Sequence, residues 1–366
     1  MQFDCPCKEF SDAVAMASNA TSTRTSLPIL QTVKIEADSG GIRVLGCDGE
    51  MWVERKLACM VSEPGTVCLQ ARTLNDIVSS LAAADVTVKT LDGQGGLLTQ
   101  GASEYRLQAM ESADFPEPPT FGGDGELTLP MGELRSAVDS VLYAVSGDPH
   151  RAILNGVLFA YDGSKLTLVA TDTHRLAVRT LEKEGIGSTM TVVVPEKALK
   201  AIKALPLGDD DPVEIRFGGG RLGVEAGGAK VVSQLLNGTF PNWERVVPSE
   251  TTRTWSVEVD QLEEKVRRAM ILAKDNANRL RFKGDGDEIV IAGRSEERGE
   301  AKESVPMVAN NGDIEIAFNG SYVRDAISVI HGDGVRIEMT ENTRPAVFKP
   351  ADGNGYFCVI MPMQLT

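Results

Sequence analysis

Hydrophobic residues recur at two different spacings along this chain. Over 130–145 they lie three or four residues apart, at Leu134, Val138, Val141 and Val145, which is the spacing of one buried helix face. Similar spacing recurs in further stretches. We expect helices over 5–19, 71–82, 130–145, 195–205, 258–274 and 319–331. Ser11 and Asp260 are expected to be caps or first-turn residues of two of these helices.

Between the expected helices, apolar and polar residues alternate with a period of two around turn residues. The stretches 34–46 and 158–170 predict β-hairpins with Ser-Gly-Gly and Asp-Gly-Ser at their turns. The stretch 216–236 predicts a glycine-linked meander of strands. Helices that alternate with many antiparallel strands predict an α+β fold, in which the helices pack on one face of the sheets.

The pattern repeats with a period close to one third of the 366 residues. Asp48 in LGCDGEM corresponds to Asp172 in VATDTHRL, and Phe115-Pro116 corresponds to Phe240-Pro241. The expected helices fall into three sets at about the same spacing. We therefore expect three domains of similar topology, separated by loops around 118–125 and 248–254. Their expected ranges are 1–124, 125–249 and 250–366.

Composition restricts the class of protein. The chain carries 52 acidic and 37 basic residues, a formal charge of −15, so a general nucleic-acid coat is disfavoured, although contact with DNA on one inner surface is not. No apolar stretch is long enough to span a membrane, and the N-terminal residues lack a secretory signal, so we expect a cytoplasmic protein. The six cysteines have no metal-site spacing and are expected to be reduced thiols.

Three similar domains in one chain could form a curved array that closes head to tail on a second copy. Twelve helices spaced about 9 Å apart would then surround a hole of roughly 24 Å, which is wide enough for duplex DNA. The expected helices are together close to neutral, so the negative charge lies mostly outside them. Lys197, Lys200 and Lys203 form a row that could face phosphates, or could be a solvated helix face.

Six segments give the chain a resemblance to a known family. They are SLPIL (26–30), LNGVLF (154–159), VATDTHRLAV (169–178), FPNWERVVP (240–248), FNGSYV (318–323) and MPMQL (361–365). Along its whole length the chain resembles the bacterial beta sliding clamps, the processivity subunits of DNA polymerase III. The resemblance implies a homodimeric ring of two three-domain chains, with helices lining the inside and antiparallel sheets outside.

The resemblance also implies what the protein does and what it binds. It implies a DNA sliding clamp that encircles double-stranded DNA without sequence specificity, has no catalytic activity, and needs no cofactor or metal. The implied partners are the replicative polymerase alpha subunit, the clamp loader, and other polymerases and repair proteins that carry short peptide motifs. No membrane partner is implied.

A peptide-binding groove between the second and third domains is implied by the same motifs. Aliphatic and Met side chains would offer an adaptable apolar surface, with His174, Arg175 and Arg245 as a polar rim. A short peptide with Gln and Leu or Phe anchors would fit such a groove. The implied groove residues are Leu154, Thr171, Thr173, His174, Arg175, Leu176, Pro241, Arg245, Val246, Val359, Ile360, Met361, Pro362 and Met363.

Two further sets of residues are expected on DNA-facing and dimer surfaces. The expected DNA-facing residues are Arg24, Lys197, Lys200, Asn319 and Tyr322. The expected dimer-interface residues are Tyr105, Leu107, Ile271 and Leu272. The chain also departs from the family, since Thr173 stands where Gly is frequent and Gln364 stands where Arg is frequent.

An alternative function is a three-domain enzyme or scaffold that uses the groove for a small ligand. Asp172 and His174 could then be an acid–base pair, but no nucleophile or metal set accompanies them, and a clamp explains the threefold repeat that an enzyme does not require. Gly218-Gly219-Gly220 lacks the Lys-Ser/Thr of a phosphate-binding loop and predicts a hairpin turn.

Overall fold

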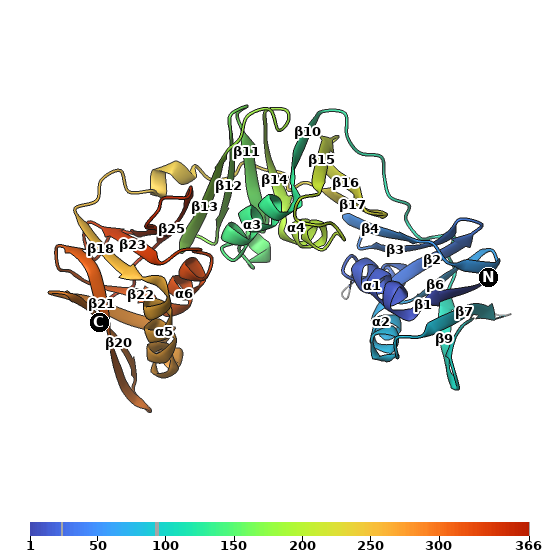
Figure 1. Cartoon of the computed structure of the whole chain (residues 1–366), viewed down its shortest axis with the longest axis horizontal. Helices are drawn as coiled ribbons and strands as arrows, with labels where there is room; N and C mark the ends of the chain where they lie inside the picture. Colours follow the sequence, from blue (N-terminus) through green and yellow to red (C-terminus); the bar gives the residue numbers. More distant parts are fainter. Residues whose placement is uncertain (23–24, 92–94, 366) are drawn as a thin grey trace. The chain divides into compact units, whose positions relative to one another are not determined.

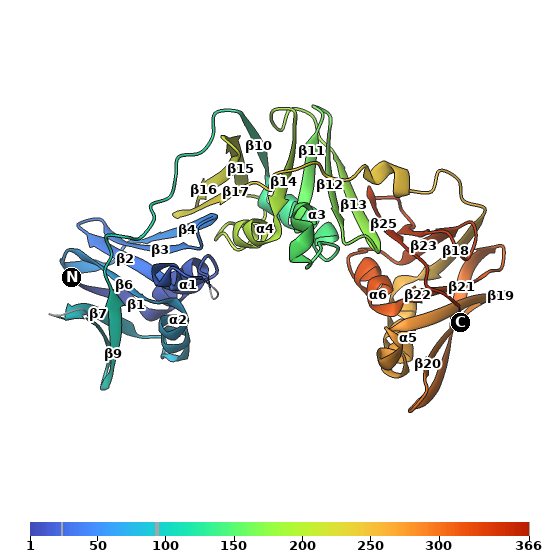
Figure 2. The same ribbon diagram turned by 180° about the vertical axis from the view of Figure 1, so that it is seen from behind.

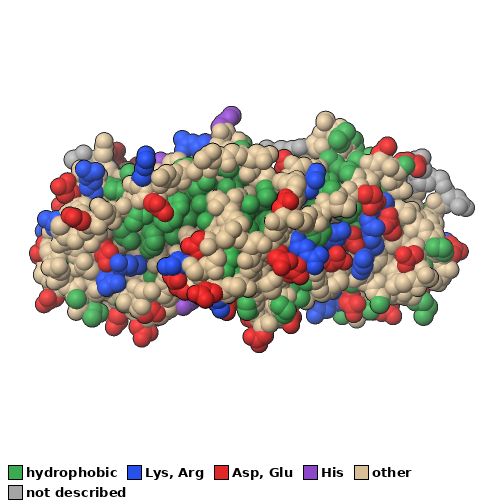
Figure 3. Space-filling view, turned by 90° about the horizontal axis from the view of Figure 1, so that it is seen from above, with side chains coloured by type: hydrophobic (Ala, Val, Ile, Leu, Met, Phe, Trp, Pro, Cys, Tyr) green, Lys and Arg blue, Asp and Glu red, His purple; other side chains and the backbone are tan. Residues whose placement is uncertain are grey.

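The computed structural model describes residues 1–22, 25–91 and 95–365 (Figure 1). Within these ranges, none of the helices combines the length and the apolar character that crossing a membrane would require. Acidic and basic side chains are interspersed on the face shown in Figure 3, with hydrophobic side chains visible between them.

One order of elements occurs three times along the chain. The second and third repeats each contain a strand, a helix, four strands, a helix and three strands, and the first repeat has one extra short strand, β5. This order confirms the predicted threefold repetition and the α+β fold class. The first repeat contains β1 (Gln2–Pro6), α1 (Cys7–Ser18), β2 (Thr32–Asp38), β3 (Gly41–Cys47), β4 (Met51–Leu57), β5 (Met60–Glu63), β6 (Gly65–Gln70), α2 (Ala71–Ser80), β7 (Asp85–Leu91), β8 (Gly95–Gln100) and β9 (Ser103–Met110).

The other two repeats follow the same sequence of strands and helices. The second contains β10 (Gly125–Pro130), α3 (Met131–Leu142), β11 (Gly156–Tyr161), β12 (Lys165–Thr171), β13 (Arg175–Glu182), β14 (Met190–Pro195), α4 (Glu196–Lys203), β15 (Pro212–Gly218), β16 (Arg221–Ala226) and β17 (Ala229–Gln234). The third contains β18 (Arg253–Glu258), α5 (Val259–Ala269), β19 (Arg279–Asp285), β20 (Glu288–Ser295), β21 (Gly299–Asn311), β22 (Glu315–Asn319), α6 (Gly320–Ser328), β23 (Gly334–Met339), β24 (Ala346–Pro350) and β25 (Tyr356–Ile360).

All six expected helices form, at slightly shorter lengths, and the two hairpins and the meander form as predicted. One capping prediction is wrong. Helix α1 begins at Cys7, with Pro6 as its N-cap and Glu9 in its first turn, so Ser11 lies inside the helix. Burial of Cys5 and Cys7 fixes this starting point. Asp260 does lie in the first turn of α5, as predicted.

Contacts divide the chain into two compact units, and each unit contains one antiparallel sheet. The first unit comprises residues 1–134, 186–188 and 197–235, and its 13-stranded sheet has the order β10-β15-β16-β17-β4-β3-β2-β6-β9-β8-β7-β1-β5. The second comprises residues 135–185, 189–196 and 236–366, and its 12-stranded sheet has the order β14-β11-β12-β13-β25-β24-β23-β18-β21-β20-β19-β22.

Each sheet continues from one repeat into another. In the first unit β17 pairs with β4, where Val231 lies opposite Val53. In the second unit β13 pairs with β25, where Leu176 lies opposite Val359. Strands of the middle repeat therefore form continuous backbone ladders with strands of both outer repeats.

Pairs of helices cover one face of each sheet. In the first unit α1 and α2 lie side by side and bury Phe10, Val14 and Leu74 against β2, β3 and β4 (Figure 1 and Figure 2). In the second unit α5 and α6 lie side by side and bury Val266 and Val323 in the core of that unit. Each fully buried aliphatic side chain contributes about 1.5–3 kcal/mol to folding, so this packing fixes where the helices lie.

The cysteines are free thiols, and five of the six are buried. Burial raises the pKa of Cys5 and Cys358 to about 12 and that of Cys47 and Cys68 to about 11. A thiol with so high a pKa is a poor nucleophile at neutral pH, so these side chains act as small apolar core residues.

Candidate functional site

A cavity of about 190 Å³ opens on the second unit where three chain segments converge. Its floor is the buried cross-strand pair Leu176 and Val359 from β13 and β25. It is small beside ligand pockets of roughly 300–1,000 Å³, and suits one or two side chains of a peptide. The lining residues are Thr171, Thr173, Arg175, Leu176, Pro241, Trp243, Val246, Val359 and Met361. We call this cavity the groove.

The walls of the groove expose apolar side chains. Val246 in the short 3-10 helix Trp243–Val246 is 44% exposed, and Met361, which follows β25, is 40% exposed. Both are among the few large hydrophobic side chains that the described residues expose to this degree. An apolar cavity with exposed aliphatic walls is typical of a site that binds another molecule's hydrophobic side chains.

The turn between β12 and β13 positions one wall. Oδ1 of Asp172 accepts the N–H groups of His174 and Arg175 at 2.9 and 3.0 Å, which closes a two-residue turn. Thr173 at the tip has a φ of 77°, in the left-handed region that β-branched residues rarely adopt. Nη1 of Arg151 donates to its hydroxyl oxygen at 2.8 Å, and the N–H of Met361 donates to the carbonyl of His174 at 2.9 Å.

Arg175 joins the groove to helix α6. Its Nη1 lies 2.6 Å from Asp325 Oδ2 on α6, its Nε lies 3.0 Å from Asp172 Oδ2, and Nη2 donates to the Tyr143 carbonyl at 2.5 Å. The guanidinium also lies 4.5 Å from the centroid of the Tyr322 ring, a cation–π contact. Burial lowers the pKa of Arg175, but the hydrogen bond to Asp325 and the charges of both carboxylates outweigh it and raise the pKa above its ordinary value.

Comparison with known proteins identifies the family. Family models for the N-terminal, central and C-terminal domains of the DNA polymerase III beta subunit match residues 1–119, 128–242 and 244–364. The chain belongs to the DNA polymerase III beta subunit family. Its function is accordingly that of a DNA sliding clamp, a processivity factor without catalytic activity of its own.

Individual relatives support this assignment. The beta sliding clamp of Staphylococcus aureus is 30% identical over 355 residues, which cover 94% of both chains. The structure of the Pseudomonas aeruginosa sliding clamp bound to griselimycin is 28% identical, with a TM-score of 0.89 and full coverage of both chains. The beta subunit from Thermotoga maritima, 22% identical with a TM-score of 0.92, has the same fold over the full length of both chains. The resemblance seen in the motifs is confirmed.

The structure brings together eight of the fourteen residues expected in the clamp groove. The other six do not line this cavity: Leu154 and Ile360 are buried, Pro362 and Met363 are half-buried, and His174 and Arg245 are exposed. Arg175, expected in the polar rim, is one of the eight lining residues, and its side chain is only 10% exposed and is bonded to two carboxylates.

Trp243 lines the groove and was missed by the sequence analysis. From the segment FPNWERVVP, the expected groove residues include only Pro241, Arg245 and Val246. A large aromatic residue beside Pro241 in a polar loop was the available signal, because a tryptophan in such a loop commonly serves a binding surface.

The residues expected to face DNA differ in their surroundings. Lys197 on α4 is paired with Asp48 at 2.5 Å and Glu50 at 3.1 Å, so two acidic groups already balance its charge. Lys200 is exposed on the same helix. The side chain of Asn319 caps α6 through the N–H of Ser321. Arg24 lies outside the described residues.

The last expected DNA-facing residue, Tyr322, lies beside the groove network. Its ring stacks on His174 with centroids 6.3 Å apart, and it contacts the guanidinium of Arg175. Burial is the main cause of its raised pKa, and the charge of Asp172 adds to it. Tyr322 lies in the first turn of α6, and Asn319 is the N-cap of that helix. Neither residue lines the groove.

The residues expected at the dimer interface lie on two separate surfaces. Tyr105 and Leu107 are on β9 and pack partly against the core of the first unit. Ile271 and Leu272 form a 3-10 turn after α5 in the second unit, and Ile271 is 59% exposed. An isoleucine exposed to this degree is an apolar contact available to another surface.

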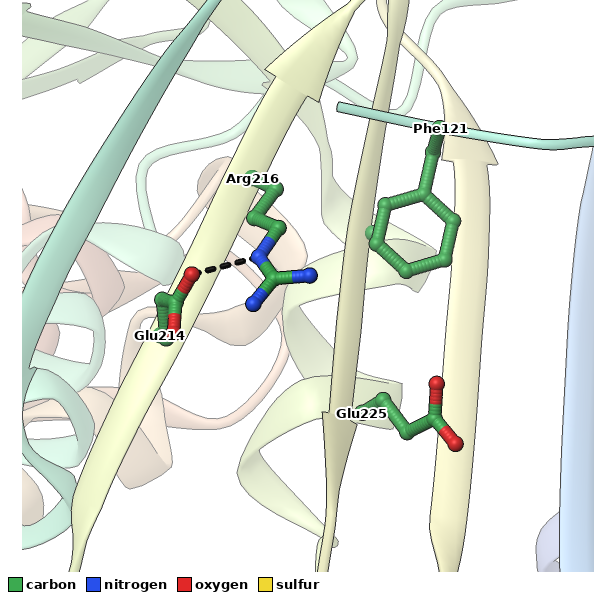
Figure 4. Close-up of a pocket in the computed structure, with 5 residues that line it drawn as sticks. Phe121, Glu214, Arg216 and Glu225 are labelled. Carbon is green, nitrogen blue, oxygen red and sulfur yellow. Dashed lines mark hydrogen bonds and ion pairs between the residues drawn. The ribbon is translucent and has the colours of Figure 1, made fainter. Parts of the chain in front are cut away.

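Another cavity of about 210 Å³ lies on β15 and β16 of the first unit (Figure 4). Phe121 packs over Gly223, where a Cβ atom would meet the ring, and Arg216 is paired with Glu214 on the same strand. Its charged groups are exposed, and Phe121 is a residue of the loop before β10. We assign no binding role to this cavity. The described residues also contain no cluster of three His, Cys, Asp or Glu side chains that could hold a metal ion.

Proposed function

We propose that two copies of this chain form a closed ring that encircles duplex DNA in the cytoplasm. The ring would hold DNA polymerase on its template through short peptides bound in the groove. The observation that supports this proposal most directly is the threefold order of elements in a chain of the clamp family. We propose domain ranges of 1–124, 125–249 and 250–366.

Two strand edges support the head-to-tail dimer. Residues Ser103–Gln108 of β9 pair with β8 on one side, while β6 pairs only with Ala109 and Met110. Residues Gly299–Pro306 of β21 pair with β20, while β18 pairs only with the later part of the strand, Met307–Asn311. In the part of the chain that the structure describes, the stretches Ser103–Gln108 and Gly299–Pro306 therefore each have one edge without a ladder partner.

The two free edges are different surfaces of the chain, so joining β9 of one copy to β21 of another is a heterologous contact. Such a contact repeats around a circle and can close with two copies. Tyr105 and Leu107 lie on the free stretch of β9, and Ile271 follows the helix that packs on β21. We propose these residues, with Leu272, as the apolar part of the interface.

For DNA we propose contacts that position the duplex without reading its bases. Arg24, Lys197, Lys200, Asn319 and Tyr322 are the proposed residues. Long basic and polar side chains can contact phosphate oxygens at any sequence, which allows sliding. Specificity for sequence is not needed, because a closed ring retains DNA by encirclement.

The proposed partners of the groove are the replicative polymerase alpha subunit, the clamp loader, and other replication and repair proteins with short motifs. The supporting features are its apolar floor, its exposed Val246 and Met361, and its size. Leu154, His174, Arg245, Ile360, Pro362 and Met363 would belong to the wider surface around the eight residues that line it. One relative, the Pseudomonas aeruginosa clamp, has been solved with griselimycin bound.

Retention on DNA tests the ring. The protein is loaded onto nicked circular plasmid with a bacterial clamp loader and ATP, and the complex is isolated by gel filtration. We expect the protein to stay on the circle, to be lost when a restriction enzyme cuts it once, and to stay on linear DNA whose ends are blocked by bound protein. Equal loss from circular and linear plasmid would contradict encirclement.

A further inference from the structure

A second cavity of the second unit, of about 300 Å³, has a chemistry unlike that of the groove. Three arginines line it, Arg279 and Arg281 on β19 and Arg294 on β20, together with Glu300 on β21. Alternation along β19 explains their common direction. Leu280 and Phe282 are buried in the core below the helices. Arg279 and Arg281 alternate with them along the strand and therefore point to the opposite face of the sheet.

The three guanidinium groups are held to different degrees. Arg281 is paired with Glu315, and Nη1 of Arg279 donates to the carbonyl of Gln364 at 3.3 Å. Arg294 is exposed and lies opposite Glu300 in the β20–β21 ladder, but it makes no ion pair with any of the described residues. Glu300 in the lining and Glu315 beside Arg281 offset only two of the three arginines, so the cavity keeps a positive excess in a chain whose formal charge is −15. Clustered guanidinium groups of this kind bind carboxylates in bidentate geometry.

The segment after β25 connects this cavity to the groove. Met361 lines the groove, Met363 forms a bridge with Ala317 of β22, and Leu365 lines the arginine cavity. Four residues of extended chain span at most about 14 Å, so the two cavities lie within reach of one short peptide. A partner that places apolar anchors in the groove can place a neighbouring acidic residue among the arginines.

We propose that the arginine cavity binds acidic residues that flank the groove-binding motif of a partner protein. This inference rests on the proposed peptide-binding function of the groove. Carboxylates are favoured over nucleic-acid phosphates as the ligand, because the chain segment that walls the cavity also walls the groove. The site would thus select among partners that share the same apolar anchors but differ in the charge beside them.

Fluorescence anisotropy with synthetic peptides tests the proposal. The parent peptide carries Gln, Leu and Phe anchors. Two derivatives add three Asp residues at its N-terminal or C-terminal end, and matched derivatives add three Asn residues. Each is titrated with the full-length protein, with R294Q, and with R344Q as a control that removes an exposed arginine from outside the cavity.

We expect one of the two Asp derivatives to bind about three- to tenfold more tightly than its Asn counterpart. R294Q should abolish this gain and leave the affinity of the parent peptide unchanged, while R344Q should keep the gain. Raising the salt to 0.5 M should reduce it. Equal affinity of Asp and Asn derivatives at both ends would overturn the proposal, as would a gain that survives R294Q.

Other outcomes point elsewhere and also overturn the proposal. If R294Q shifts the oligomeric mass in light scattering without changing the peptide gain, the cavity belongs to an interface between copies. If R294Q weakens binding of a single-stranded oligonucleotide and not of the acidic peptide, the ligand is nucleic acid. Failure of the parent peptide itself to bind would instead contradict the groove, and with it the proposed function.

Discussion

Asp48 and Asp172, one period apart in the sequence, make the same turn in two different repeats. Oδ1 of Asp48 accepts the N–H groups of Glu50 and Met51 at 2.9 and 2.8 Å, as Oδ1 of Asp172 does for the residues two and three positions after it. The Oδ2 atoms are alike too, since one pairs with Lys197 and the other with Arg175. The repeat is therefore preserved at the level of single hydrogen bonds.

The residue after each aspartate needs a positive φ, which predicts the effect of a substitution at Gly49. Gly49 has a φ of 95°, and Thr173 adopts 77° at the equivalent place. A Cβ at Gly49 would meet only Leu30 at an ordinary 3.8 Å, so backbone strain alone opposes a side chain there. We expect Gly49→Thr to lower the free energy of unfolding by about 1–3 kcal/mol, measured by urea denaturation.

Gly147→Thr is the matched control, because Gly147 has open space around it and is not among the glycines with positive φ. It should change stability by less than about 1 kcal/mol. If both variants lose the same free energy of unfolding, the positive φ of Gly49 is not the reason that a side chain is unfavourable there.

Asp325 is predicted to hold Arg175 in place at the groove. The Arg175 side chain is only 10% exposed, and Asp325→Asn removes one of the two carboxylate charges that balance it. We therefore expect the free energy of unfolding to fall by about 1–3 kcal/mol. The affinity for a groove-binding peptide should fall as well, although Asp325 does not line the groove. Asp333→Asn, a change at an exposed aspartate of the same unit, serves as the control and should alter neither quantity.

Trp243 is predicted to contribute much of the groove's binding energy. Trp243→Ala should weaken a groove-binding peptide at least about 30-fold, which corresponds to 2 kcal/mol for an aromatic anchor. Trp243→Phe should retain most of the affinity. Isothermal titration calorimetry measures the affinity of both variants. If Trp243→Ala binds the peptide as tightly as the unchanged protein does, the prediction is wrong and the aliphatic walls supply the binding energy.

The interface prediction concerns Ile271 and Leu272. Replacing both with alanine should shift the dimer towards monomers, because apolar contacts at a buried interface are lost. Folding of each chain should change little, since Ile271 is 59% exposed. Light scattering at low micromolar concentration gives the mass. Met60→Ala, at a methionine 71% exposed on β5, should leave the dimer unchanged.

Glu117 is predicted to make stability depend on pH in the acid range. It lies in the loop after β9, with Oε1 2.5 Å from Nζ of Lys34 and Oε2 2.7 Å from Arg43. Burial alone would raise its pKa, but these two partners lower it below the usual value. A carboxylate with a depressed pKa stabilises the fold above its unfolded pKa of about 4.5, and that contribution is lost as the pH falls through the folded value.

The comparison of wild type with Glu117→Gln isolates this effect. At pH 7 the wild type should have the higher urea midpoint, and the difference should shrink as the pH falls below about 4.5. A difference that stays constant down to pH 3 would mean that the glutamate acts through packing and not through its charge.

Much of the fold could be predicted because its determinants are local. Helical spacing, turn residues and the repeat of Asp48 and Asp172 lie within short segments, and all six helices follow from them. Ser11 failed as a cap because the start of α1 depends on burial of Cys5 and Cys7 against other elements. The capping preference of an isolated serine is weaker than that packing.

The site was predictable only in part, because its chemistry arises from tertiary contacts. The motifs place Arg175 in a polar rim, and nothing near it in sequence indicates that Asp325, 150 residues away, would pair with it. The arginine cavity is likewise invisible in sequence, since Arg279 and Arg294 come together only through the register of β19 and β20.

The ladders that run from β4 into β17 and from β13 into β25 have a mechanical consequence. Pulling one repeat away from its neighbour would require several backbone hydrogen bonds to break together, so these two strand pairings resist mechanical separation. Opening the proposed ring between its two copies would leave both of these ladders intact.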